Sequence, residues 1–136
     1  MTEPTPPVLQ RFVTEKVVLL HTRKRDGSWV GTPVNIAVGG DRAYFRTPGM
    51  ASKVKRLRNF PEVRFAPCTW FGRPTGPPVQ AVTRRLDGAE SAHAARLIGR
   101  KHPVLQGVVV PLIHRLLRTE TLHYELSAVR DVAPGS

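Results

Sequence analysis

The chain has 136 residues, of which 40% are hydrophobic, and it carries a formal net charge of +11. This length and composition suit one compact domain spanning 1–136, because no composition shift or long linker divides the sequence. The longest apolar stretch, 104–117, contains a glycine, a proline, a histidine and an arginine, and it is too short to span a bilayer. Cys68 is the only cysteine, which excludes an intrachain disulfide and fits a cytoplasmic protein.

The N-terminal third of the chain predicts strands joined by tight turns. Residues 1–11 contain prolines and lack a basic region followed by an apolar run, so we expect a loose arm and no secretory signal. The stretch 16–22 is β-branched and apolar, and Asp26-Gly27 after it is a strong hairpin signal. We therefore expect a return strand over 29–38 and a third strand over 43–47.

Pro33 lies inside the expected strand 29–38. A proline cannot donate a ladder hydrogen bond, which places this position at an edge, at a bulge or at a rim that faces a ligand. The residues alone leave open whether Pro33 simply marks an edge or faces a bound molecule.

The segment 47–63 predicts a turn, a short cationic helix and the start of a strand. Met50, Val54 and Leu57 recur at helical spacing and can face a core. The polar residues then lie on two flanks, with Ser52, Lys53, Arg56 and Asn59 on one and Lys55 and Arg58 on the other. An anion at the start of this helix would meet free backbone N–H groups, a hydroxyl and cationic side chains, which indicates a phosphate-binding site.

Two more strands, over 62–68 and 78–86, are predicted on either side of a loop at 69–77. The loop combines Trp70 and Phe71 with glycines, prolines and an arginine. Such a loop can form the rim of a pocket or enter a dimer interface, and the sequence leaves both open.

The C-terminal part predicts a helix over 87–101 capped by Asp87, a second apolar helix over 105–118, and a closing strand over 121–128. In this last strand Leu122, Tyr124 and Leu126 alternate with polar residues, as in a half-buried strand. Six β segments and few helices predict a mainly β (α+β) fold, a small antiparallel barrel with appended helices.

Several kinds of chemistry find no support in the residues. The five histidines show no spacing that suits a metal, and the ten acidic residues are dispersed. Cys68 has no evident histidine partner, and the sequence contains neither GxGxxG nor a Walker motif. A domain of this kind can catalyse when a cofactor carries out the difficult step.

Five segments follow one another along the chain in an order typical of one superfamily. They are KVVLLHT, GTPVNIAV, AYFRT, the basic helix with its NFPEV exit, and FAPCTWFGRPTGP. In this order and spacing the chain, over 13–129, resembles the pyridoxamine 5'-phosphate oxidase-like (PPOX-class) split β-barrels of the FMN-binding type. Within that superfamily it is similar to the small actinobacterial oxidoreductases that use the deazaflavin coenzyme F-420. The resemblance implies a split barrel of about six strands and a homodimer with its cofactor cleft between two barrels.

The resemblance also implies roles for residues of this chain. The coenzyme phosphate would be held by Ser52, Lys53 and Arg56, with Thr47 close by. The ring would lie along Thr32, Pro33 and Val34, and Asn59, Lys55 and Arg58 are secondary candidates for the coenzyme tail. For Lys55 and Arg58 a solvated helix face is the alternative. The chain departs from the pattern at Asn35 and Ile36, where many relatives have an aromatic residue.

The function so indicated is hydride transfer between reduced coenzyme F-420 and an electron-poor organic acceptor. An FMN-dependent reductase or oxidase of the same fold is the nearest alternative, and a non-catalytic coenzyme-binding protein is another. Nucleic-acid binding through the +11 charge ranks last, because no element is placed to read bases. Part of the charge can also serve solubility alone. We expect neither stable membrane insertion nor a metal site.

Overall fold

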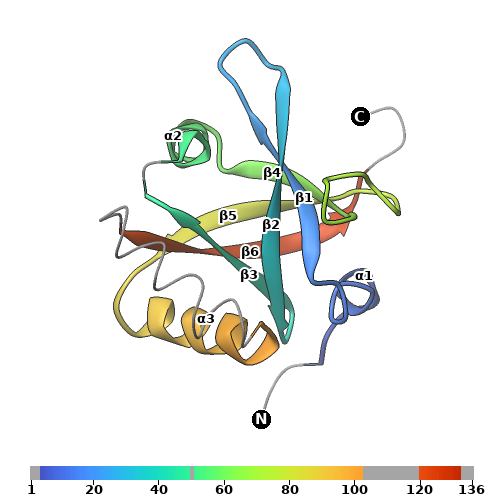
Figure 1. Ribbon diagram of the computed structural model, residues 1–136, viewed down its shortest axis with the longest axis vertical. Helices are drawn as coiled ribbons and strands as arrows, with labels where there is room; N and C mark the ends of the chain where they lie inside the picture. The colour runs from blue at the N-terminus through green and yellow to red at the C-terminus, as the bar shows by residue number, and fades with distance from the viewer. Residues whose placement is uncertain (1–3, 50, 103–119, 133–136) are drawn as a thin grey trace.

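The computed structural model describes residues 4–49, 51–102 and 120–132, and it shows a β-barrel with helices around it (Figure 1). The strands are β1 (Val17–Arg23), β2 (Trp29–Gly39), β3 (Arg42–Pro48), β4 (Glu62–Pro67), β5 (Val79–Leu86) and β6 (Thr121–Asp131). The helices are α1 (Pro7–Gln10), α2 (Ser52–Asn59) and α3 (Gly88–Lys101). Met50 and the second apolar helix expected at 105–118 lie outside the described residues.

The six strands form a closed barrel in the order β1-β2-β3-β6-β5-β4, with every neighbouring pair antiparallel. Strand β2 serves two neighbours in turn, since its residues 29–35 pair with β1 and its residues 36–39 pair with β3. This architecture confirms the predicted mainly β fold of a small six-stranded antiparallel barrel. None of the helices described is both long and apolar enough to cross a bilayer.

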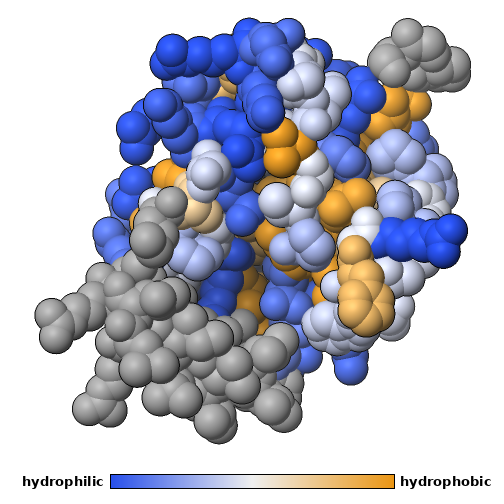
Figure 2. All heavy atoms as spheres, turned by 45° about the horizontal axis from the view of Figure 1, so that its top comes forward, coloured by the Kyte–Doolittle hydropathy of each residue, from blue (hydrophilic) through white to orange (hydrophobic). Residues whose placement is uncertain are grey.

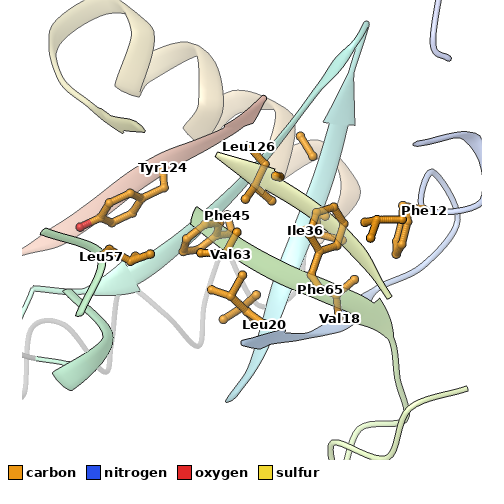
Figure 3. Packing of buried hydrophobic residues seen from close by; sticks show 14 of the residues in the cluster. Phe12, Val18, Leu20, Ile36, Phe45, Leu57, Val63, Phe65, Tyr124 and Leu126 are labelled. Atoms are coloured by element: carbon orange, nitrogen blue, oxygen red, sulfur yellow. The ribbon is translucent and has the colours of Figure 1, made fainter. Parts of the chain in front are cut away.

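The core fills the inside of the barrel and is closed by side chains from the helices (Figure 3). Phe45 and Tyr124, on adjacent strands, stack with ring centroids 5.2 Å apart and planes 8° from parallel. At one end Leu57 and Val54 of α2 pack on the core, as their spacing predicts. Helix α2 is thereby fixed against the barrel by two apolar residues, which leaves its polar residues outside.

The N-terminal residues differ from the loose arm expected over 1–11. Residues 7–10 form the short helix α1, and the side chains of Leu9 and Phe12 are fully buried. Phe12 lies with its ring centroid 4.8 Å from that of Phe65 in the barrel. Burial of a large apolar side chain contributes about 1.5 to 3 kcal/mol, so the two buried side chains offset a substantial part of the entropy lost when this short segment is ordered. The prediction was wrong for this part of the arm because it weighed the prolines and overlooked the apolar residues.

Residues 122–126 of β6 are buried on both faces, whereas alternation predicted a half-buried strand. His123 and Glu125, on its polar face, are 9% and 4% exposed. Helix α3 covers this face, and Ser91 Oγ lies 2.8 Å from His123 Nδ1. A second small core of Ala94, Ile98 and residues of β2, β3 and β5 holds α3 in place. Asp87 occupies the N-cap position of α3, but its side chain makes no capping hydrogen bond.

Candidate anion-binding site

A hollow of about 290 Å³ lies between helix α2 and the hairpin that joins β1 to β2. Its lining consists of Arg23, Lys24, Arg25, Ser52, Lys55, Arg56 and Asn59. Figure 2 looks onto this end of the molecule and shows hydrophilic residues gathered over the hairpin and α2. Five of the seven lining residues are cationic and none is acidic, so the hollow attracts anions.

The start of helix α2 adds to this attraction. The N-cap residue is Ala51, which makes no side-chain capping hydrogen bond, and the first turn contains no acidic residue. The first backbone N–H groups of a helix have no partner within the helix, and the helix dipole favours negative charge there. Cations at this end are unfavourable for the helix alone. A bound anion would satisfy both the N–H groups and the cations.

Arg56 is held in place from beneath the hollow. Its Nε donates a hydrogen bond of 2.7 Å to Oγ1 of Thr22, a residue of β1 that is fully buried. One edge of the guanidinium is thus fixed by the barrel. A guanidinium carries five N–H donors, so the remaining donors are available to a ligand in the hollow that Arg56 lines. Sequence reasoning gave no signal for the role of Thr22, which depends on the packing of α2 on β1.

Lys53 differs in orientation from what the sequence implied. It does not belong to the lining of the hollow, and its Nζ lies 3.4 Å from Oγ1 of Thr47, which is 2% exposed. Burial, and to a smaller extent the charge of Arg56, lowers the pKa of the Lys53 ammonium from its usual value. The structure therefore brings Lys53 and Thr47 together, as expected, but outside the lining of the hollow that contains Asn59 and Lys55.

The hairpin supplies three cations that sequence reasoning missed, Arg23, Lys24 and Arg25. The neighbouring acid, Asp26, does not line the hollow. Its Oδ1 accepts hydrogen bonds from Ser28 Oγ at 2.6 Å and from Ser28 N at 2.9 Å. These bonds lower the pKa of the Asp26 carboxyl. The run of three cations directly before the Asp26-Gly27 turn was the available signal, but the prediction of the hairpin rested on Asp26-Gly27 alone.

The segment Thr32-Pro33-Val34 lies on β2, outside the lining of this hollow. Thr32 pairs with Leu20 and Val34 with Val18, so their side chains face the barrel interior. Thr32 Oγ1 is buried and has no hydrogen-bond partner within the described residues.

Pro33 is exposed on the outer face of β2, at a point where β2 pairs only with β1 among the described strands. Of the positions that the sequence left open for Pro33, an edge, a bulge or a rim that faces a ligand, the structure therefore shows an edge. Gly72, in the loop 69–77, has a φ of +83° and approaches so closely that a Cβ there would lie 3.3 Å from Pro33 Cγ. In the same loop, Trp70 and Phe71 are 62% and 97% exposed.

The chemistry available at the hollow is binding and positioning. Among the described residues that line it there is no carboxylate and no imidazole, so they offer no evident general acid or base. Within residues 4–49, 51–102 and 120–132 no three histidine, cysteine or acidic side chains come together in a way that would hold a metal. Cys68 is buried, and burial raises the pKa of its thiol, which disfavours a nucleophilic thiolate.

Neither a protein-family model nor a curated protein sequence matches the chain, but solved structures do. A Listeria innocua protein provisionally named pyridoxamine 5'-phosphate oxidase shares 12% identity over 92% of each chain, with a TM-score of 0.58. The chain therefore has the pyridoxamine 5'-phosphate oxidase-like split-barrel fold.

Two other solved structures that match the chain are named for heme. HutZ, the heme storage protein from Vibrio cholerae, shares 12% identity over 94% of each chain, with a TM-score of 0.63. A heme binding protein from Mycobacterium smegmatis shares 16% identity over 96% of this chain and 56% of its own, with a TM-score of 0.64. At these identities the comparison establishes the split barrel, and the ligand must be inferred from the residues of this chain.

Proposed function

We propose that this split-barrel protein is an oxidoreductase that transfers a hydride between reduced deazaflavin coenzyme F-420 and an electron-poor organic acceptor. The observation that carries the proposal is the hollow of five cations and no acid at the start of α2. A phosphorylated coenzyme with an acidic tail matches this charge. The absence of an acid or base from the lining is compatible with a cofactor that supplies the hydride itself.

In this proposal the residues of the chain hold and orient the coenzyme. Ser52, Arg56 and the first N–H groups of α2 bind the phosphate, with Arg56 oriented by Thr22. Asn59, Lys55 and the three hairpin cations bind the acidic tail. Lys53 and Thr47 support this end of the helix from behind and add positive charge without facing the hollow. The fixed position of Arg56 reduces the entropy lost when the anion binds.

The ring of the coenzyme is assigned to the outer face of β2 at Pro33, beside the loop that carries Gly72. Thr32 and Val34 contribute through their backbone, because their side chains face the barrel interior. A homodimer forms part of the proposal, with Trp70 and Phe71 contributing exposed aromatic surface to the contact.

FMN in the same position is the second candidate, since it also carries a ribityl phosphate that suits Ser52 and Arg56. A protein that binds the coenzyme without turnover is the third. A measurement of affinity distinguishes FMN binding from the leading proposal. A measurement of turnover distinguishes the non-catalytic coenzyme-binding protein from it.

The test is a titration of the purified protein with coenzyme F-420, FMN and heme in turn, at low and high salt. Heme is included because two proteins of the same fold are named for it. We expect the tightest binding for coenzyme F-420, weakened by salt as contacts between exposed charges are. Binding of FMN or heme in preference to the deazaflavin would refute the cofactor assignment.

Turnover is then measured by mixing the protein with reduced coenzyme F-420 and a set of quinones and activated alkenes. We expect oxidation of the coenzyme that depends on both protein and acceptor. Tight binding without turnover across the set would favour the non-catalytic binding protein over the oxidoreductase.

A further inference from the structure

A second and larger hollow, of about 400 Å³, lies on the outer face of the barrel. All the residues that line it belong to five strands, β1, β2, β4, β5 and β6. The lining includes the place where the register of β5 against β6 shifts, between Gln80 and Val82. The lining side chains that carry charge or hydrogen-bonding groups are Arg23, Trp29, Glu62, Arg64, Gln80 and Arg130. Apart from Arg23, none of them borders the hollow at α2.

The strand register aligns the polar residues of this hollow. His21 on β1 pairs with Arg64 on β4, Arg64 pairs with Gln80 on β5, and Gln80 pairs with Arg130 on β6. Directly paired residues of antiparallel strands point to the same face of a sheet. The barrel therefore carries a row of polar side chains across four strands, which are far apart in the sequence.

Trp29 holds two of the arginines beside this row. The guanidinium carbon of Arg23 lies 4.8 Å from the centroid of the indole ring, and that of Arg64 lies 5.2 Å from it. Stacking on an aromatic face orients a guanidinium and leaves the N–H groups at its edge free to bind an anion. Two cations attracted to one ring also repel each other, which an anion between them would relieve.

The balance of charge in the hollow is positive. Three guanidiniums face the single carboxylate of Glu62, and within the described residues none of the three forms an ion pair. Arg130 Nη2 is placed to donate to the Gln80 amide oxygen at 2.8 Å once that amide is oriented with its oxygen toward the guanidinium. Burial, followed by the charge of Arg64, lowers the pKa of His21, so the imidazole in the row is mainly neutral at pH 7.

We propose that this outer hollow is a binding site for a small anion with at least two acidic groups, next to the coenzyme site at α2 and sharing only Arg23 with it. Arg64 and Arg130 each bind an acidic group through the edge of the guanidinium, and Trp29 with Arg23 forms the side wall. Glu62 offsets one of the three cations, so a monoanion would neutralise only half of the remaining positive charge, which is why the site selects for anions with at least two charges. The proposal does not depend on which cofactor the chain uses.

The experiment uses citrate as the probe and acetate as the monoanion control, at matched ionic strength. The chain has two tryptophans, so a Trp70→Phe variant makes Trp29 the only indole reporter. We expect citrate to change Trp29 fluorescence with saturation, and acetate to leave it unchanged. No saturable change with citrate would overturn the proposal.

Variants in the same background locate the bound citrate. Loss of a charge-assisted hydrogen bond weakens binding by about tenfold or more, so Arg64→Gln and Arg130→Gln are each expected to raise the citrate Kd by that factor. Arg130 is exposed on β6, so its replacement leaves the core intact if Arg64→Gln disturbs folding. Arg96→Gln, on the exposed face of α3, removes the same charge elsewhere and should leave the Kd unchanged.

Two other results would overturn the assignment. An equal loss of affinity in Arg96→Gln would mean that citrate responds only to the net charge of the protein. A loss confined to an Arg56→Ala variant would place citrate in the hollow at α2 instead. Neither result would alter the binding of coenzyme F-420 measured in the absence of citrate, so the coenzyme proposal is tested independently.

Discussion

Replacement of Arg56 by alanine tests the anion site at α2 most directly. Arg56 is the residue of the hollow whose guanidinium is held by the barrel, through the 2.7 Å hydrogen bond from its Nε to Thr22. A hydrogen bond to a charged group contributes about 1.5 to 3 kcal/mol. If one such bond joins Arg56 to the coenzyme phosphate, Arg56→Ala should raise the Kd for coenzyme F-420 by about 10-fold to 150-fold.

The variant also changes stability, and the two effects must be separated. Removal of Arg56 leaves the fully buried Thr22 hydroxyl without its partner, which costs about 1 to 3 kcal/mol of folding free energy. Urea unfolding measures this cost, and the titration is done where the variant is fully folded. A Thr22→Val variant keeps the Arg56 charge but releases its anchor, so it should weaken binding less than Arg56→Ala does.

Arg96→Ala serves as the matched control, because it removes the same charge from an exposed position on α3. It should leave the Kd for the coenzyme within about twofold of the unsubstituted protein, as expected for a charge screened by salt over a distance. An Arg56→Ala protein that is folded and binds the coenzyme with unchanged affinity would refute the reasoning, since the anion would then not lie in this hollow.

Four further outcomes are expected. Lys53→Met should weaken coenzyme binding less than Arg56→Ala, because Lys53 does not line the hollow; a larger loss in the same titration would contradict its orientation. Phe12→Ala should lower the free energy of unfolding by about 3 to 5 kcal/mol in urea, and a loss below about 1 kcal/mol would mean that α1 is not docked. Burial lowers the pKa of Lys101 to about 8, below its value in the unfolded chain. Because unfolding then takes up protons, the free energy of unfolding should rise with pH between about 8 and 10. This rise should be less steep in Lys101→Met. Phe71→Ser should raise the dimer dissociation constant in sedimentation, whereas an unchanged constant would exclude this loop from the contact.

Local patterns in the sequence were sufficient for most of the elements. Alternation and turn residues located the strands to within a few positions, and the spacing of Val54 and Leu57 identified the buried face of α2. These signals are readable because a strand or a helix repeats its contact with the core at a fixed period along the chain. The same spacing placed Ser52, Lys53, Arg56 and Asn59 on one flank. Three of these line one hollow, but Lys53 does not, and Lys55 from the other flank does.

The sequence did not predict the contacts between residues that are distant along the chain. The hairpin cations Arg23 to Arg25 join the α2 hollow only because β1 pairs with β4, which follows α2 and fixes the helix beside the hairpin. Lys53 turned toward Thr47 for a related reason, since the barrel end offers a buried hydroxyl that periodicity cannot reveal. The burial of His123 and Glu125 likewise depends on α3, an element that the alternation of β6 does not describe.

The sequence by itself therefore determined the order of the six strands with α2 and α3, the strong positive charge and the amphipathic basic helix. The tertiary structure alone decided which cations share a hollow and which are held apart. Periodicity is a property of neighbouring residues, and it fixes the face on which a side chain lies. The partners on that face are set by strand register and barrel closure, which join Arg64, Gln80 and Arg130 across three strands because each strand must pair with both neighbours.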